Sequence, residues 1–348
     1  MISFIIAIIV LGLIVTFHEL GHFLFSRLFS VKVINFSLGM GPELWSFVRG
    51  DTEYSLRVVP FGGSCMMDED DFLDKAPWKR FFIVLGGPLF NLILAFLLSL
   101  VLTADIGADI PFVVAVEKDM PAYDSGLSEG DIITCISFGE ASADIHVSRD
   151  LYLFLYIHGA DLTEDTVINI RYMDPADGEE GWASFRPAYS EETGSYRMGI
   201  SYNMAYLPID SPMEVIRYGA YNLRYNLVSA FESVKLLLSG GAERTDVMGP
   251  VRIVGTIDDT VSEASGYGIR FTLMTIFNIM IVISVSLGVM NLLPIPALDG
   301  GRLIFILIEL IFRRPVPRKL EAAIHMGGMA LLLVLMMLIL FNDISLLT

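Results

Sequence analysis

Cysteine and the basic residues are both scarce in this chain. Its 348 residues contain two cysteines, Cys65 and Cys135, and neither has a second Cys or a His at metal-ligand spacing, which excludes a zinc finger. Lysine and arginine number 23 against 40 acidic residues, so the net charge is −17. An acidic balance of this size argues against a nucleic-acid-binding protein.

Charged residues make up only 18% of the chain, whereas 54% of the residues are hydrophobic and the mean hydropathy is +0.61. This composition is too apolar for an ordinary soluble domain. A run of about 20 apolar residues is long enough to cross a bilayer. Runs of this kind occupy 2–28, 81–102, 271–290 and 324–341. We therefore expect a polytopic α-helical membrane protein with about four transmembrane segments.

Lysine and arginine cluster in two of the stretches that separate these runs, 27–80 and 302–319. The positive-inside rule places both stretches in the cytoplasm. The acidic stretch 105–270 then faces outward. Cys65 and Cys135 would lie on opposite sides of the membrane, so they cannot form a disulfide. A shorter apolar run, 303–312, either re-enters the bilayer or lies along it.

The chain divides into four predicted segments. Residues 1–104 form a membrane core that includes a β-hairpin region near the cytoplasmic face, and residues 105–205 form an inserted extracytoplasmic α+β domain. Residues 206–270 form an extracytoplasmic amphipathic segment, and residues 271–348 complete the membrane core. Within the insert we expect a helix at 148–156 and strands at 112–116, 132–137, 167–172 and 195–202.

The most informative pattern is His18-Glu19-Leu20-Gly21-His22, inside the first apolar run. Two histidines at i and i+4 lie on one face of a helix, so both imidazoles can reach one zinc ion, with Glu19 beside them as a base for water. An ionisable residue inside a bilayer costs about 2.5 to 3.5 kcal/mol, which makes a chance match in a soluble helix the weaker alternative. A secretory signal peptide is excluded because the run lacks a basic start and a cleavage site.

A catalytic zinc ion needs a third protein ligand, and no Glu or His follows His22 at a suitable distance on the same helix. Asp299 is the candidate, with a helix-capping role as the alternative. It lies in the stretch 291–301, where Pro294 and Pro296 interrupt the apolar pattern. Because prolines break a helix and remove amide donors, they leave the Asn291 amide free to hydrogen-bond a ligand.

Two other polar residues lie in apolar runs. We expect Asn91, which follows Gly86-Gly87-Pro88, to form an interhelical hydrogen bond. His325, at the start of the last run, has no partner at i+4, so we expect it to pack or to lie at an interface.

These patterns together resemble the site-2 proteases, and the chain is similar to the bacterial RseP-like branch with a single PDZ domain. The resemblance extends over nearly the whole chain. It rests on the HExxH pattern, on Gly39-Met40-Gly41-Pro42 with the hairpin after it, on Gly86-Gly87-Pro88-Leu89-Phe90-Asn91, on the PDZ-like stretch 122–133 and on 291–301.

The resemblance implies an intramembrane zinc metalloprotease that cleaves transmembrane helices. His18, His22 and Asp299 would be the zinc ligands and Glu19 the general base. Asn291, with Pro294 and Pro296 beside it, would hold the unwound substrate. The hairpin residues that would pair with the substrate as an added β-strand are Tyr54, Leu56 and Val58.

The implied partners are the lipid bilayer and single-pass membrane proteins, such as anti-sigma factors or remnant signal peptides. The implied location is the bacterial inner (cytoplasmic) membrane, with the PDZ-like domain outside it as a size filter. The chain departs from the family pattern at Ser64-Cys65, where an aromatic residue and a lysine are usual, and at Ile136-Ser137-Phe138-Gly139, where an Ile-Asn-Gly turn is usual.

Two other functions remain open from the residues alone. Broken apolar segments with buried carboxylates also occur in transporters and channels. A non-catalytic scaffold that binds membrane partners through the PDZ-like domain is the second alternative. The zinc content of the purified protein distinguishes a transporter from a protease. The effect of Glu19→Gln on substrate cleavage distinguishes a scaffold from a protease.

Overall fold

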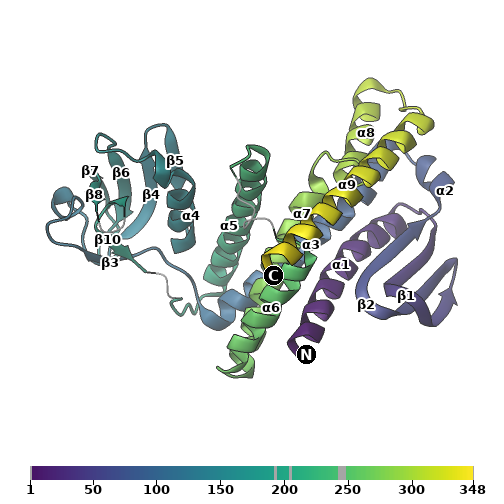
Figure 1. The fold of residues 1–348 in the computed structure, drawn as a ribbon, viewed down its shortest axis with the longest axis horizontal. Coiled ribbons are helices and arrows are strands. Elements are labelled where there is room, and N and C mark those ends of the chain that lie inside the picture. Colours follow the sequence, from purple (N-terminus) through teal and green to yellow (C-terminus); the bar gives the residue numbers. More distant parts are fainter. Residues whose placement is uncertain (1, 192–193, 204–205, 242–247, 348) are drawn as a thin grey trace. The chain divides into compact units, whose positions relative to one another are not determined.

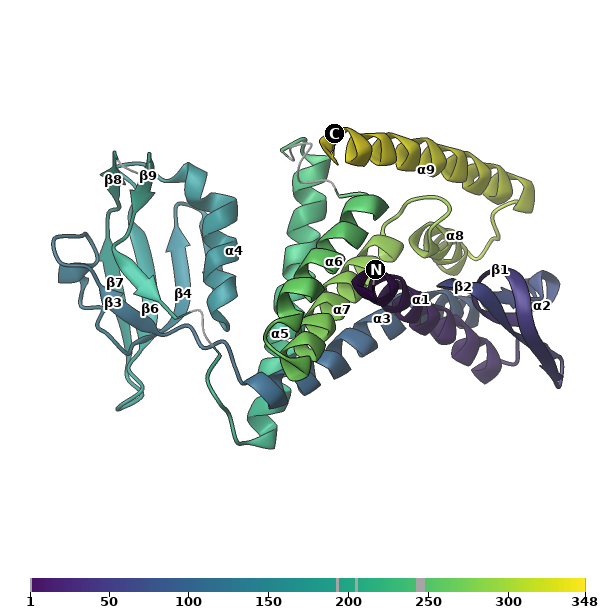
Figure 2. The same cartoon turned by 60° about the horizontal axis from the view of Figure 1, so that its bottom comes forward.

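The computed structural model describes residues 2–191, 194–203, 206–241 and 248–347, and Figures 1 and 2 trace the chain. The chain forms two compact units. One comprises Met1–Ser99 with Asn226–Thr348, and the other comprises Leu100–Tyr225.

Long apolar helices build the first unit. They are α1 (Ile2–Leu28), α3 (Pro77–Ile106), α7 (Ile269–Leu292) and α9 (Arg318–Leu347). Within the described ranges, these four are the helices long and apolar enough to cross a membrane. Each contains one of the apolar runs in the sequence, which fits a polytopic membrane protein.

Side chains from α1, α3 and α7 form one apolar cluster of this unit, around Val10, Ile14, Leu94 and Met280. Helices α1 and α3 approach closely because glycines face each other at the crossing. A Cβ atom on Gly21 would overlap the carbonyl group of Gly86. Small residues allow such backbone contact between membrane helices.

Shorter helices also belong to this unit: α2 (Glu69–Leu73), α6 (Pro250–Ser265) and α8 (Asp299–Phe312). Helix α8 has 14 residues, so at about 1.5 Å per residue it is too short to cross a hydrocarbon core of about 30 Å. The first turn of α6 is capped from α9. The buried carboxylate of Asp343 accepts hydrogen bonds from the backbone N–H groups of Gly249, Val251 and Arg252, at 2.9 to 3.1 Å.

A sheet of β1 (Val33–Arg49) and β2 (Thr52–Met67) lies beside α1 (Figures 1 and 2). Both strands bend, so that separate parts of each pair with the other. Phe36 lies opposite Tyr54 and also opposite Cys65, and Tyr54 in turn lies opposite Phe47. Residues 54–56 are therefore paired with two neighbours, whereas residues 63–67 have their recorded partners in the first part of β1.

The second unit is an α+β domain whose main sheet has the strand order β5-β4-β6-β7. These strands are β4 (Ile132–Phe138), β5 (Ala141–Asp144), β6 (Ile168–Met173) and β7 (Glu180–Phe185). Further strands pair as β3 (Val113–Val116) with β10 (Ile200–Tyr202), and β8 (Ala188–Ser190) with β9 (Ser195–Arg197). Helix α4 (Ser148–His158) covers a core that includes the fully buried Ile133, Ile136, Leu151, Ile168 and Ile170.

The strands and the helix expected between 112 and 202 are present, and the last expected strand is divided into β9 and β10 at Gly199, which has φ +78°. The unit also includes the first half of α5 (Pro212–Leu238), which the sequence pattern assigned to a separate segment. Its Tyr221 ring stacks on His146, and Arg224 lies 3.3 Å from the carboxylate of Asp150 on α4.

Candidate metal centre

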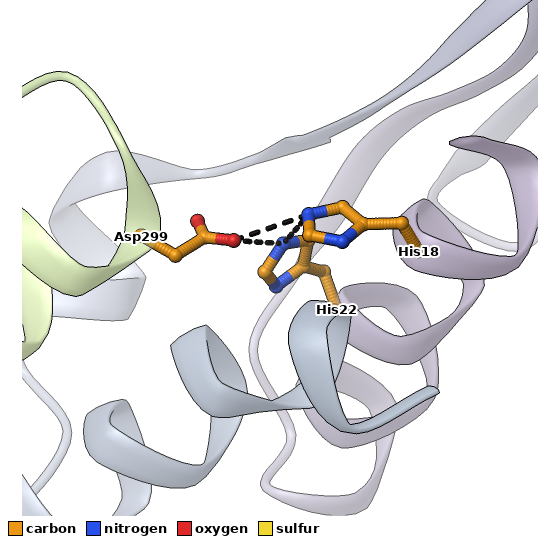
Figure 3. Close-up of side chains that lie close together, drawn as sticks. All are labelled: His18, His22 and Asp299. Carbon is orange, nitrogen blue, oxygen red and sulfur yellow. Dashed lines mark hydrogen bonds and ion pairs between the residues drawn. The ribbon is translucent and has the colours of Figure 1, made fainter. Parts of the chain in front are cut away.

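Three side chains from distant parts of the sequence converge in the first unit. Asp299 Oδ2 lies 3.1 Å from His18 Nε2 and 3.4 Å from His22 Nε2, and the two Nε2 atoms are 3.2 Å apart. Figure 3 shows the carboxylate on the first residue of α8 facing both imidazoles from α1. Both histidines are buried, and the Asp299 side chain is 20% exposed.

These distances suit a zinc ion. Ligand atoms at 2.0 to 2.2 Å from a tetrahedral zinc ion are about 3.4 Å from one another. The observed triangle of 3.1, 3.2 and 3.4 Å has nearly that size. Two imidazole nitrogens and one carboxylate oxygen are a usual ligand set for catalytic zinc and leave a fourth position open. Elsewhere in the described part of the chain, no comparable group of three His, Cys, Asp or Glu ligand atoms occurs.

The second nitrogen of each imidazole contacts α3. His22 Nδ1 lies 2.9 Å from the carbonyl oxygen of Ile83, and His18 Nδ1 lies 3.2 Å from the side-chain amide of Asn91. A histidine that binds metal through Nε2 carries its proton on Nδ1 and donates it to such a neighbour. With metal bound, the amide of Asn91 would turn its Oδ1 atom toward His18. The interhelical hydrogen bond expected for Asn91 thus reaches a candidate ligand.

The space between the imidazoles depends on Gly87 in α3. A Cβ atom at this position would overlap His22 Nε2 and lie 2.6 Å from His18 Nε2. Only glycine leaves both nitrogen atoms free. Sequence reasoning did not assign Gly87 to the site, although two glycines before a proline inside an apolar run are a signal of close backbone approach.

Glu19 and Asn291 line the same cavity as the three converging side chains. The cavity has a volume of about 370 Å³. Glu19 Oε2 accepts a hydrogen bond from the backbone N–H of Cys65 in β2, at 2.8 Å. Cys65 and Met67 also line this cavity, which brings residues 63–67 of the sheet to the candidate centre. Burial, followed by the nearby Glu19 charge, raises the pKa of the Cys65 thiol to about 12, so the thiol is neutral at physiological pH.

The sheet residues predicted from the sequence lie elsewhere. Tyr54 and Leu56 are in the part of β2 that is paired on both sides, and Val58 is half exposed; none of them lines the cavity. The predicted set did not include Cys65 and Met67, which do line it. The sequence gives little sign of this part of β2, because the alternating pattern favours residues 52–58. The bends at Gly39 (φ +86°) and Gly62 (φ +83°) decide which part of β2 lies next to the centre.

The loop between α7 and α8 carries Pro294 and Pro296 and ends just before Asp299. Leu298 occupies the N-cap position of α8, and Asp299 is the first helical residue. The Asp299 carboxylate faces the imidazoles, so the geometry favours the ligand position over the helix-capping alternative. Neither proline lines the cavity, but both lie within the stretch that turns the chain toward it.

Comparison with known proteins identifies the family. The sequence model of peptidase family M50 matches residues 6–335. Three similar proteins each carry the name "Putative zinc metalloprotease". One, from Clostridium acetobutylicum, is 31% identical over 98% of this chain and 97% of its own length. Those from Clostridium perfringens and Fusobacterium nucleatum are 31% and 32% identical, each over 98% of both chains. The chain therefore belongs to peptidase family M50, the site-2 proteases.

Proposed function

We propose that this protein is an intramembrane zinc metalloprotease that hydrolyses a peptide bond within a transmembrane helix of another membrane protein. The observation that carries the proposal is the convergence of His18, His22 and Asp299 beside Glu19. The M50 family, the zinc metalloprotease names of the relatives and the apolar helices support a membrane metalloprotease.

His18, His22 and Asp299 would hold the zinc ion. When bound, zinc supplies a Lewis acid that acidifies water and polarises the scissile carbonyl group. Glu19 acts as the general base: its carboxylate takes the proton of the attacking water and passes it to the leaving amide nitrogen. The hydrogen bond from Cys65 N–H to Glu19 Oε2 fixes the position of this carboxylate and leaves Oε1 as the proton acceptor.

A substrate helix must unwind before it can be cut, because its carbonyl groups are held in i to i+4 hydrogen bonds. We propose that the unwound segment lies between residues 63–67 of β2 and Asn291. Cys65 and Met67 of this stretch line the same cavity as Asn291. Residues 63–67 would pair with the unwound segment as an added strand. Tyr54, Leu56 and Val58 would then support the sheet or contact the substrate through side chains, and Pro294 and Pro296 would shape the opposite wall.

Water needs a polar route to the centre. A second cavity of about 400 Å³ shares Cys65, Met67 and Arg302 with the cavity at the metal centre. Charged and polar side chains line its far part, among them Glu321 and His325. We propose that water enters through this second cavity, from the cytoplasmic side that the positive-inside rule assigns to this end of the helices.

The substrates we propose are single-pass membrane proteins of the bacterial inner membrane, such as anti-sigma factors or remnant signal peptides, cut during regulated intramembrane proteolysis. The Leu100–Tyr225 unit is proposed as the PDZ-like domain outside the membrane, where it limits access to substrates that have already been shortened. Its α+β fold and acidic sequence are compatible with this role.

The test uses the purified full chain in lipid vesicles with a model transmembrane substrate. We expect about one zinc ion per chain and cleavage within the substrate helix. Glu19→Gln should keep the zinc ion and lose cleavage, whereas His18→Ala should lose both. Cleavage by Glu19→Gln at the wild-type rate would overturn the assignment of the base. Zinc-free wild-type protein that moves ions across the vesicle would favour a transporter.

A further inference from the structure

Helix α9 provides no candidate ligand, yet it contacts the loop that leads to Asp299. His325 Nδ1 accepts a hydrogen bond from the backbone N–H of Ala297, at 3.0 Å. The His325 side chain is 17% exposed. Because Nδ1 is the acceptor, the proton of the neutral ring is on Nε2, so the ring is held in one tautomer. The sequence prediction that His325 merely packs or lies at an interface misses this contact.

The residue that His325 holds has a strained backbone. Ala297 has φ +80°, a conformation that residues with a Cβ atom rarely adopt. It lies two residues before Asp299, so its backbone angles set the direction in which the chain enters α8. A strained residue persists only where its surroundings hold it. The hydrogen bond to His325 is such a restraint.

A second contact from α9 lies one helical turn after His325. A Cβ atom on Gly328 would overlap the side chain of Pro296 and lie 2.7 Å from its carbonyl oxygen. A Cβ atom on Gly301 of α8 would lie 2.5 Å from the carbonyl oxygen of Ile295. Residues 295–297 thus contact Gly301 of α8 and both His325 and Gly328 of α9.

We propose that His325 and Gly328 form a clamp on residues 295–297, and that His325 is a positioning residue that holds Asp299 at the metal centre. The proposal rests on the metal centre of the proposed function. His325 acts through the Ala297 amide and does not touch the metal. Its loss leaves the three ligands in the sequence but lets the strained loop relax, which moves the Asp299 carboxylate away from the imidazoles. The clamp therefore sets how tightly the centre holds zinc.

The experiment measures zinc retained by the purified full chain during titration with a chelator. His325→Leu removes the acceptor, and outer residues that orient metal ligands change affinity about 10- to 100-fold. We expect a loss of zinc affinity of at least about tenfold, and near wild-type affinity for His325→Asn, whose Oδ1 replaces Nδ1 as acceptor. Unfolding of the zinc-free proteins, measured in parallel, shows whether each variant is folded.

Adjacent glycines on α9 provide a matched pair. Gly328→Ala should push Pro296 and lower zinc affinity, whereas Gly327→Ala meets no atom within 4 Å and should leave zinc affinity unchanged. The pair tests the clamp even if His325→Leu fails to fold. Wild-type zinc affinity in both His325→Leu and Gly328→Ala would overturn the clamp and leave the protease proposal standing. Wild-type protein that binds no zinc would overturn both.

Discussion

Replacing Gly87 with alanine should weaken zinc binding strongly by steric exclusion. The added methyl carbon would overlap His22 Nε2 and lie 2.6 Å from His18 Nε2 and 2.7 Å from His18 Cε1. A carbon and a nitrogen in van der Waals contact are about 3.5 Å apart, so the methyl group would overlap both Nε2 atoms that face Asp299. Either the imidazoles rotate away from Asp299 or α3 moves.

Both responses are costly. Overpacking a filled site costs about 1 to 3 kcal/mol, and imidazoles that rotate also leave Ile83 and Asn91. If about 2.7 kcal/mol of this cost opposes zinc binding, the affinity for zinc falls by about 100-fold. We therefore expect Gly87→Ala to lose zinc at chelator concentrations that leave the wild type fully loaded, and to lose proteolysis with it.

The assay is zinc content by elemental analysis of purified protein after dialysis against a chelator. Gly255→Ala on α6 is the control, because its added methyl group meets no atom within 4 Å. A helical alanine in place of glycine stabilises by about 0.5 to 1 kcal/mol, so this control should unfold slightly later and bind zinc normally. Wild-type zinc affinity in Gly87→Ala would refute the placement of α3 against the two histidines.

Three further predictions concern the surroundings of the centre. Asn91→Leu should lower zinc affinity about 10- to 100-fold in chelator titrations, because His18 loses the partner of its Nδ1 atom; unchanged affinity would contradict that role. Asp343→Leu should lower the free energy of unfolding by about 1 to 2 kcal/mol in denaturation experiments through loss of the α6 cap, with zinc affinity kept; equal stability would argue against the cap. In a Cys135→Ser background, Cys65 should react with a maleimide roughly 1000-fold more slowly than an ordinary thiol at pH 8, because a pKa of about 12 leaves little thiolate. The rate should rise with pH, and fast labelling at pH 8 would contradict the raised pKa.

Local patterns predicted the parts of the fold that depend on neighbours in the sequence. The apolar runs located α1, α3, α7 and α9 to within six residues at each end, because a membrane helix satisfies its own backbone and needs only length and apolarity. The HExxH pattern also placed His18 and His22 together, because residues i and i+4 lie on one face of any α-helix. The first half of α5 shows the limit: its amphipathic pattern predicted the helix but not the unit it packs into.

Features that depend on contacts between distant segments were harder to predict. Asp299 was found through its setting, a carboxylate after a proline-interrupted apolar run. The part of β2 beside the cavity lies outside the stretch that the alternating pattern favours, because bends change the pairing and alternation alone cannot locate a bend. Ala297 gave no signal, since a positive φ at alanine follows from packing against α9 and not from its own preference.

Burial of the centre explains why residues that resemble simple packing restrict its geometry. An imidazole in an apolar helix is tolerated only if each nitrogen has a partner, because an unpaired buried polar group is costly. The Nδ1 atoms have the Ile83 carbonyl oxygen and the Asn91 side-chain amide as partners, and Asp299 faces both Nε2 atoms. Gly87 keeps the space between them open. A substitution at Asn91, Gly87 or Asp299 changes the hydrogen-bond partners or the space available to the histidines, so we expect zinc affinity to depend on α3 as well as on the HExxH helix.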